Sequence, residues 1–326
     1  MSKPSPKSAG KSSAPPHQPA RKRRQSVGER VSDVYHEAQR KVAHALTVMW
    51  DDLPAWMQDN HFIIRGYRPQ SSSFKRSLGS LLYWHNESVN IYTHLLGSIG
   101  LIITGMYLHH VIAPRYPSST IKDRMVIGTF FLCEATCLAL SATFHTISNH
   151  SVPVAKFGNQ LDYLGIVIAI FGSTVPSVYY GFYCYEKLMR TYWIMMGTIG
   201  LLVAYATFDP RFRTPKYRPI RASLFIGMGI SGVFPVLHAL TLYPSIQDVD
   251  ERMGLRWMLL QGFFYVFGAV IYAARVPERF YPGRFDLVGA SHQIFHCFVI
   301  MAAVSHMWGL VRAFDWAHSR GGDVCY

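Results

Sequence analysis

Long apolar runs dominate the chain from about residue 88 to residue 311. Seven runs are about 20 residues long or more, and short polar or proline-containing segments separate them. A helix of about 20 apolar residues crosses roughly 30 Å of hydrocarbon. The pattern predicts an all-α fold, a seven-transmembrane helix bundle, with helix cores near 88–112, 123–147, 157–180, 189–208, 220–243, 255–274 and 287–311.

The segment before the first apolar run has a different pattern. Residues 1–28 are rich in Ser, Pro, Lys and Arg, and such a segment cannot bury enough apolar surface to offset the entropy of ordering. From Glu29 to Met49, apolar residues recur at helical spacing, which predicts a short amphipathic helix. A second short helix is predicted to begin at Asp52, with Pro54 in its first turn.

These patterns divide the chain into four parts. We expect a disordered basic tail, a helical juxtamembrane segment, a seven-helix membrane domain and a C-terminal tail, over residues 1–28, 29–85, 86–312 and 313–326.

Basic residues give the membrane domain an expected orientation. They concentrate before the first apolar run and in the links after the fourth and sixth runs, around Arg211–Arg221 and Arg275–Arg284. Cytoplasmic loops carry an excess of Lys and Arg. The N-terminus is therefore predicted to be cytoplasmic and the C-terminus extracytoplasmic, in the plasma membrane or the endoplasmic reticulum.

Composition supports a membrane protein and argues against nucleic acid as a partner. Half of the residues are hydrophobic and 16% are charged, whereas a soluble domain has about a quarter charged. The net charge of +13 arises mainly from the tail and from particular loops. The five cysteines are expected to form no disulfide framework, and the absence of a CxxC pair excludes a thiolate zinc finger.

Three histidines and one aspartate lie near the same predicted membrane depth. His145 is close to the end of the second run, Asp162 is about one turn into the third, and His292 and His296 are in the first two turns of the seventh. The i, i+4 spacing of the last two places both rings on one helix face. Three imidazoles form a zinc site that leaves one position open for water, as catalytic sites do.

Other polar residues extend this predicted site. Asp162 is expected to orient water, to act as a general base or to fix a histidine tautomer. Ser141 lies one turn deeper than His145, where its hydroxyl can contact substrate or can bond to its own helix. Glu134 continues the same face, and a carboxylate at that depth should line a wet cavity or be protonated.

Isolated histidines and a proton relay are alternative interpretations. His94, His238 and His306 also lie in apolar runs, where a single histidine is typically a hydrogen-bonded packing residue. Chains of Asp, Glu and His also carry protons across membranes. A relay needs these groups strung out across the bilayer, and their common depth favours a metal.

The same residues lie in motifs that match a known family. Over residues 50–312 the chain resembles the progestin and adipoQ receptor family, which includes adiponectin receptors and haemolysin III-like proteins, and its basic tail is similar to fungal members. The matching motifs are Asp59-Asn60, Gly66-Tyr67-Arg68, Asn86-Glu87-Ser88-Val89-Asn90-Ile91-Tyr92-Thr93-His94, Ser141-x3-His145, Leu161-Asp162-Tyr163-Leu164-Gly165, Pro282-Gly283-Arg284-Phe285-Asp286 and Ser291-His292-Gln293-Ile294-Phe295-His296.

This resemblance implies zinc bound by His145, His292 and His296, with Asp162 and Ser141 beside it. It also implies a zinc-dependent ceramidase, which hydrolyses the ceramide amide to a sphingoid base and a free fatty acid, and a role in lipid and zinc metabolism. The alternative is a non-enzymatic receptor in which zinc is structural. The expected partners are membrane lipids, an extracellular ligand of unknown identity and further copies of the chain.

Overall fold

The structure is a computed structural model that describes residues 28, 34, 46–209, 211, 217–319 and 325. Within these residues, seven helical spans are long and apolar enough to cross a membrane, and none of the named elements is a strand. The predicted all-α class and the seven spans are thereby confirmed, and the chain is an integral membrane protein. The spans are α3 (Ser88–Tyr107, continued by short turns to Arg115), α4 (Ile121–Ile147), α5 (Val152–Gly181), α6 (Glu186–Phe208), α7 (Arg218–Ser231) with α8 (Val233–Leu242), α10 (Leu255–Ala274) and α11 (Ser291–Ser319).

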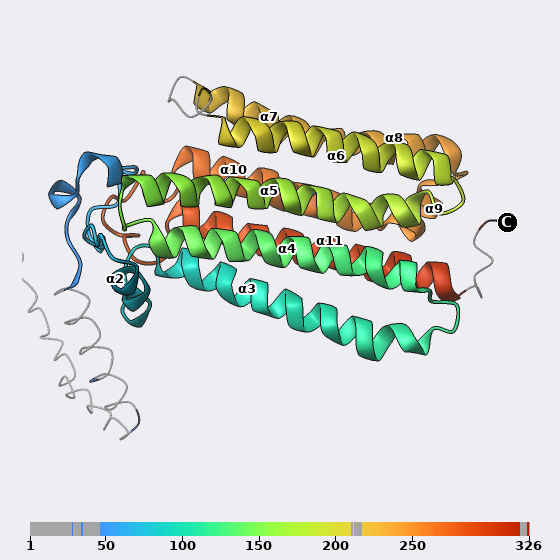
Figure 1. Cartoon of the computed structure of the whole chain (residues 1–326), viewed down its shortest axis with the longest axis horizontal. Coiled ribbons are helices and arrows are strands. Elements are labelled where there is room, and N and C mark those ends of the chain that lie inside the picture. The colour runs from blue at the N-terminus through green and yellow to red at the C-terminus, as the bar shows by residue number, and fades with distance from the viewer. Residues whose placement is uncertain are drawn as a thin grey trace, which may run out of the picture.

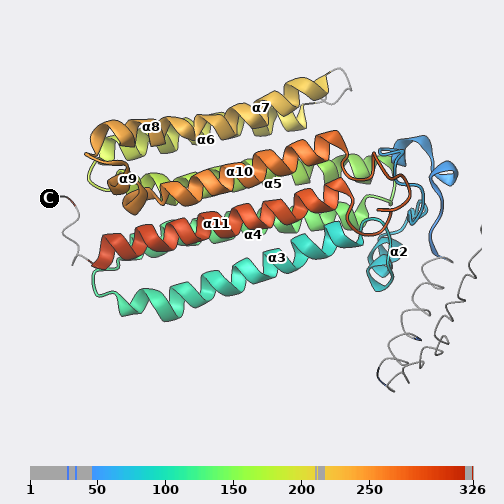
Figure 2. The ribbon, with the colours of Figure 1, turned by 180° about the vertical axis from the view of Figure 1, so that it is seen from behind.

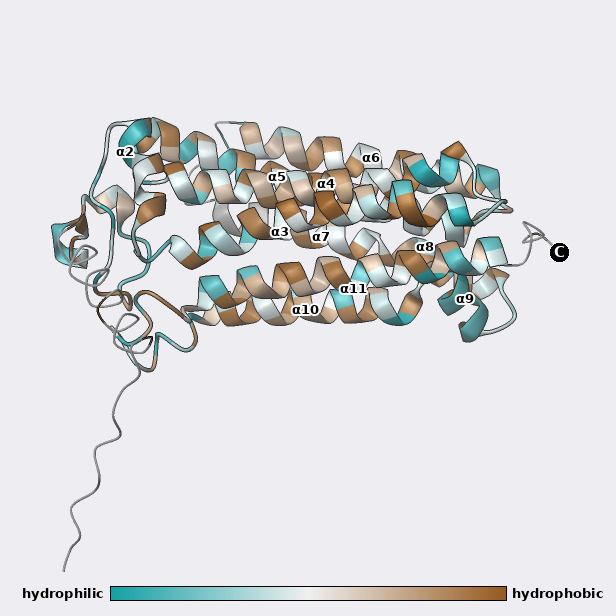
Figure 3. Ribbon diagram, turned by 90° about the horizontal axis from the view of Figure 1, so that it is seen from below, coloured by the Kyte–Doolittle hydropathy of each residue, from teal (hydrophilic) through white to brown (hydrophobic). Residues whose placement is uncertain are grey.

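The long helices run roughly parallel or antiparallel to one another along the long axis of the molecule (Figures 1 and 2). α4 packs between α3 and α5, and α11 packs against α10 and α3. The α6, α7 and α8 helices lie at one side of the bundle and α3 at the other (Figure 1). In its most apolar window, α4 has 50% of its residues buried but α10 has only 6%. The long helices carry many apolar positions, brown in Figure 3, and exposed apolar side chains such as Leu259 and Val266 on α10 are suited to contact lipid.

Small residues allow α4 and α5 to approach closely. Gly165 and Gly172 lie one heptad apart on α5 and face α4. A Cβ atom at Gly172 would lie 2.2 Å from the Cβ of Cys133, and one at Gly165 would lie 3.1 Å from the Cα of Cys137. Close backbone approach through small residues is a common packing mode of membrane helices. It places Asp162, one turn before Gly165, against the Ser141 turn of α4.

The fifth span is broken, and the third is continuous despite its proline. α7 ends at Ser231, α8 begins at Val233, and Pro235 lies in the first turn of α8. α5 continues through Pro176 to Gly181. An internal proline removes one helical hydrogen bond, and a break in the helix is one of the ways to accommodate it. The break in the fifth span lies at Gly232, three residues before Pro235.

Short turns, together with α2 (Phe74–Gly79), build the region before the first span. The predicted helix at Asp52 is wrong, because Asp52 ends a 3₁₀ turn that begins at Trp50, and a second turn follows at Ala55–Met57. Pro54 adopts an extended conformation and caps this second turn. Most of the tail, most of the predicted amphipathic helix and much of the basic link after the fourth span lie outside the described residues.

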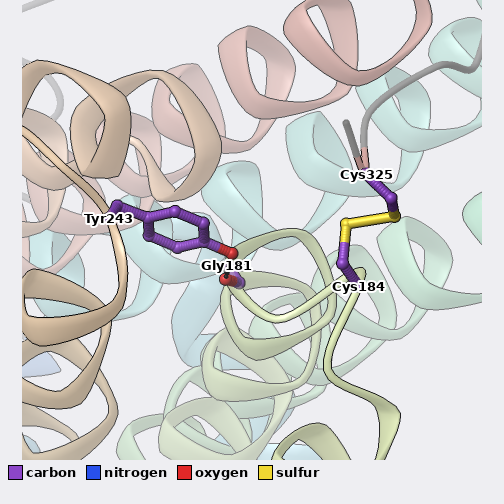
Figure 4. Close-up of a disulfide and its surroundings, with 4 residues drawn as sticks. All are labelled: Gly181, Cys184, Tyr243 and Cys325. Atoms are coloured by element: carbon purple, nitrogen blue, oxygen red, sulfur yellow. Dashed lines mark hydrogen bonds between the residues drawn. A yellow bond between two sulfur atoms is a disulfide. The ribbon is translucent and has the colours of Figure 1, made fainter.

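A disulfide joins Cys184 to Cys325, with their Cα atoms 5.5 Å apart, so the expectation of no disulfide is wrong for this pair (Figure 4). Cys184 follows α5, and Cys325 lies 141 residues later, beyond α11. Nearby, the Tyr243 hydroxyl donates a 2.7 Å hydrogen bond to the Gly181 carbonyl. The remaining three cysteines are free, as predicted for thiols within apolar helices.

α11 continues to Ser319 because Ala313, Phe314 and Ala317 keep one face buried.

Candidate metal centre

Three imidazole rings converge at one end of the bundle, and we call His145, His292 and His296 the histidine centre. His145 lies near the end of α4, and the other two lie in the first two turns of α11. One ring nitrogen from each residue lies within 4.8 Å of those of the other two. The Nε2 atom of His292 is 3.3 Å from Nε2 of His145 and 3.2 Å from Nε2 of His296. The predicted meeting of these residues is confirmed.

The spacing of these nitrogens fits a tetrahedral metal ion. Zinc binds imidazole nitrogens at about 2.0–2.1 Å, so two tetrahedral ligand atoms lie about 3.3 Å apart. Both measured Nε2 separations in the histidine centre are close to that value. Two of the three nitrogen pairs therefore have the spacing of a tetrahedral site, the third pair lies within 4.8 Å, and the three histidines from two helices could bind a metal ion.

The other ring nitrogens of His145 and His296 are held by oxygen atoms from the start of α3. Nδ1 of His145 lies 2.7 Å from a carboxylate oxygen of Glu87 and Nδ1 of His296 lies 3.1 Å from the Asn90 carbonyl. A carboxylate and a carbonyl only accept, so each Nδ1 carries the proton. Each Nε2 then presents a lone pair toward the shared point. Such outer hydrogen bonds typically fix the tautomer of metal-binding histidines.

Glu87 is held in turn by a small polar network. The side-chain amide of Asn90 donates a 2.7 Å hydrogen bond to the same carboxylate oxygen that contacts His145. Burial opposes ionisation of Glu87, but the His145 ring, the Asn90 amide and the Arg68 guanidinium together hold its pKa well below the usual range. The carboxylate is therefore charged and strengthens His145 as an electron-pair donor.

Arg68 fixes the end of α4 that carries His145. Its guanidinium is buried and donates hydrogen bonds to the carbonyls of His145 at 2.6 Å and Thr146 at 2.8 Å. The last carbonyls of a helix have no partner within the helix, and a cation there also interacts favourably with the helix dipole. Burial lowers the pKa of Arg68 to about 10, so the group stays charged at neutral pH.

A carboxylate fixes the start of α11 in the same way. Glu278 is fully buried, accepts a 2.8 Å hydrogen bond from the Ser291 backbone amide and also bonds the Ser291 hydroxyl. The Gln293 side chain accepts from the Gly289 amide at 2.6 Å. Carboxylates stabilise helix N-termini because the first amides are unpaired there. Glu278 and Gln293, which bond the backbone amides at the start of α11, therefore position His292 and His296.

Asp162 and Ser141 lie close to each other beside the histidine centre. The Asp162 carboxylate is close enough to the Ser141 hydroxyl and to His145 for electrostatic interaction. Other hydroxyls on α4 behave differently, since Thr136, Thr143 and Thr146 donate to the carbonyl four residues earlier. No such bond is found for Ser141 among the described residues, and which of its two predicted roles it has stays a prediction. Asp162 is not among the three clustered ligands.

The isolated histidines divide into two kinds. His238 lies 2.7 Å from the Tyr192 hydroxyl, and His306 has oxygen partners at both ring nitrogens, which confirms the packing role predicted for them. The prediction is wrong for His94, whose two buried ring nitrogens have no hydrogen-bond partner among the described residues. The His94 ring stacks on His296 with centroids 3.7 Å apart. The His94 ring therefore packs face to face against the His296 ring of the histidine centre.

Glu134 lies deeper in the bundle, on α4. Its side chain is 1% exposed, and neither carboxylate oxygen has a hydrogen-bond partner among the described residues. Cys133, Cys137 and Tyr265 are its electrostatic neighbours. We predicted either a wet cavity or protonation for this group, and that prediction stays a prediction.

Sequence reasoning gave no role to the residues that hold the histidine centre. Glu87, Asn90 and Arg68 appear within the matching motifs, and Glu278 does not. The sequence did contain one signal for these residues, the polar i, i+3 pair Glu87 and Asn90 at the very start of an apolar helix. In the structure this pair lies on a face turned toward the other helices. A polar pair at that position indicates an outer shell for ligands on neighbouring helices.

Similarity to known proteins agrees with these motifs. The family profile described as Haemolysin-III related matches residues 82–307. The chain is 39% identical over 271 residues to the ADIPOR-like receptor IZH2 of Saccharomyces cerevisiae, which covers 83% of this chain and 85% of that protein. It is 41% identical over 274 residues to the adiponectin receptor protein of Drosophila melanogaster, covering 84% of this chain and 60% of that protein.

A nematode relative extends the comparison. The progestin and adipoQ receptor-like protein 1 of Caenorhabditis elegans is 37% identical over 278 residues, which cover 85% of this chain and 62% of that protein. The chain thus spans less than two thirds of the length of either animal relative and most of the yeast protein. The resemblance inferred from the motifs is confirmed: the chain belongs to the haemolysin-III related family, together with the progestin and adipoQ receptors.

Proposed function

We propose that this receptor-like membrane protein binds zinc at the histidine centre and hydrolyses the amide bond of ceramide-type lipids. The observation that carries the proposal is the convergence of three imidazole Nε2 atoms with the Asp162–Ser141 pair beside them. A structural zinc site more often has four protein ligands, whereas a catalytic site has three and an open position. The described cluster has three.

The chemistry assigns separate roles to the neighbouring side chains. A zinc ion held by the three imidazoles would supply a Lewis acid that acidifies water and polarises an amide carbonyl. Asp162 takes a proton from the attacking water while the water oxygen forms a bond to the amide carbon. Asp162 then gives this proton to the amide nitrogen as the C–N bond breaks. The products are a fatty acid and a sphingoid base. Ser141 holds the Asp162 carboxylate in place and can donate to the substrate carbonyl.

Replacement of Asp162 tests the enzymatic role. Asp162→Asn should retain zinc but lower ceramide hydrolysis by about 10² to 10⁴-fold, the usual contribution of a positioned base. The assay compares purified wild-type protein with Asp162→Asn for bound metal and for release of fatty acid. Equal hydrolysis by the two zinc-loaded proteins, or no hydrolysis by either, would contradict the enzymatic role. A non-enzymatic receptor, in which zinc holds α4 against α11, would then be the better interpretation.

We further propose that the histidine centre faces the cytoplasm. The Cys184–Cys325 disulfide lies at the opposite end of the helices, since Cys184 follows the end of α5 that is distant from Asp162. Disulfides persist in oxidising compartments and are rare in the cytosol. This agrees with the orientation predicted from basic loops. An epitope tag on the N-terminus should be accessible to antibody only after the cells are permeabilised, and labelling of intact cells would contradict the proposal.

A further inference from the structure

A cavity lies at the end of the bundle opposite the histidine centre. It occupies about 310 Å³ between the end of α3, the start of α4 and the last half of α11. α3 leads away from α4 toward this end, and a π-helical turn at Leu108–Ile112 extends it (Figure 1). π turns within helices frequently mark functional sites. The volume is near the lower limit for ligand pockets, about 300 Å³.

The walls of this cavity are apolar over several helical turns. α3 contributes Ile102 and Met106, and α11 contributes Leu310 and Phe314. On α4 the lining residues follow one helix face, with Arg124 in the first turn and then Ile127, Gly128, Phe131 and Leu132. The cavity is thus an apolar trough with a cation at its end nearest the membrane surface.

At this end of the bundle, the carboxylate of the buried Asp123 lies against Thr120 and His318 rather than against the neighbouring cations. Nε of Arg124 is buried and has no hydrogen-bond partner among the described residues. Arg115 and Lys122 are exposed nearby, and none of the salt bridges within the described residues involves these three cations. The adjacent Asp315 accepts a 2.7 Å hydrogen bond from the Tyr116 hydroxyl. A buried guanidinium donor in an apolar wall favours an anionic acceptor.

We propose that this trough binds one long-chain free fatty acid, with the carboxylate at Arg124 and the acyl chain along Phe131. A single apolar chain with a small anionic head matches both the modest volume and the half-buried Arg124, whose Nε is buried. A diacyl phospholipid would leave a second chain and a large head outside the trough. Arg124 precedes His145 by 21 residues on α4, or about 30 Å at 1.5 Å per residue. The site is therefore separate from the histidine centre and does not depend on hydrolysis.

A photoreactive fatty acid tests the proposal. The full-length protein in phosphatidylcholine nanodiscs is irradiated with a diazirine analogue of palmitic acid, and the labelled peptides are mapped by mass spectrometry. Labels should fall on the α3, α4 and α11 segments that line the trough. An added Cβ at Gly128 meets no atom within 4 Å, so Gly128→Leu fills the trough without a clash. It should lower this labelling about tenfold, the equivalent of about 1.4 kcal/mol.

Matched variants and competitors separate this site from general lipid contact. Gly100 on α3 also has open space at its Cβ and does not line the trough, so Gly100→Leu should label as wild type does. Arg124→Gln should weaken labelling by the acid about tenfold, and the exposed Lys122→Gln should not. Unlabelled palmitate should compete, whereas its methyl ester should not.

Three results would overturn the proposal. Equal labelling of Gly128→Leu and wild type would show contact with surrounding lipid only. Competition by the methyl ester as strong as that by palmitate would remove the role of Arg124. Stronger displacement of the probe by phosphatidylglycerol than by palmitate would identify a phospholipid as the occupant.

Discussion

Buried histidines occur at one end of the bundle and again near its middle, and their ring nitrogens face different partners. In the middle, Nδ1 of His306 lies 2.8 Å from the Gln261 side-chain oxygen, and Nε2 lies 3.0 Å from the Ser173 carbonyl. In the histidine centre, only one nitrogen of His145 and of His296 has an oxygen partner, and the other faces a second imidazole.

This difference separates a packing histidine from a metal ligand. A ring whose two nitrogens both bond protein oxygens has no lone pair left for a metal. In the histidine centre, the protonated nitrogens of His145 and His296 are already bonded elsewhere, and their lone pairs face Nε2 of His292, where a cation can bind. His145 and His296 are as buried as His306, so for these residues the second nitrogen, not burial, distinguishes the two roles.

The strongest test of this comparison is removal of one ligand. His292→Ala should abolish zinc binding, because two imidazoles rarely hold zinc tightly. Elemental analysis of purified protein measures the ratio of zinc to chain, with about one expected for the wild type. His238→Ala removes a half-buried histidine that bonds Tyr192, and it should retain the metal. Full zinc in His292→Ala would refute the assignment.

Much of the fold followed from the sequence because the bilayer imposes a single rule on every span. Each span must be a long apolar helix, so the predicted core 123–147 corresponds closely to α4. The seventh span was less accurate at its start. Leu287, Val288 and Ala290 continue the apolar run, but Gly289 has a φ of 88°, and the helix begins only at Ser291. Hydropathy cannot distinguish an apolar loop from an apolar helix end.

The parts of the site that could be predicted are those that depend on residue spacing within one helix and on predicted depth in the membrane. The i, i+4 pair His292 and His296 and the common depth with His145 could be read directly. The contact between Glu87 and His145 joins residues 58 positions apart and depends on how α3 packs against α4. The Cys184–Cys325 pair spans 141 residues and leaves no periodic signal. Such contacts between distant residues depend on how the helices pack, and no local pattern in a single sequence indicates them.

The second prediction concerns the outer hydrogen bond of His145. Glu87→Gln keeps an acceptor for Nδ1 but removes the negative charge, so zinc affinity should fall about 10 to 100-fold. Competition with a chromogenic chelator measures that affinity. The exposed Glu186, which pairs with Arg190, supplies the control variant Glu186→Gln, for which no change is expected. Unchanged affinity in Glu87→Gln would mean that the oriented tautomer, rather than the carboxylate charge, governs the centre.

The smallest effect is expected at the packing histidine itself. His306→Leu removes interhelical hydrogen bonds that link α11 to Gln261 on α10 and to Ser177 on α5. Such bonds in membrane proteins contribute about 0.6 kcal/mol on average, so the free energy of unfolding should fall by about 1 kcal/mol. Unfolding in mixed micelles measures this change, and elemental analysis of the same sample should show full zinc. Loss of zinc from a folded His306→Leu protein would mean that the two regions act as one site, and the distinction based on the second ring nitrogen would fail.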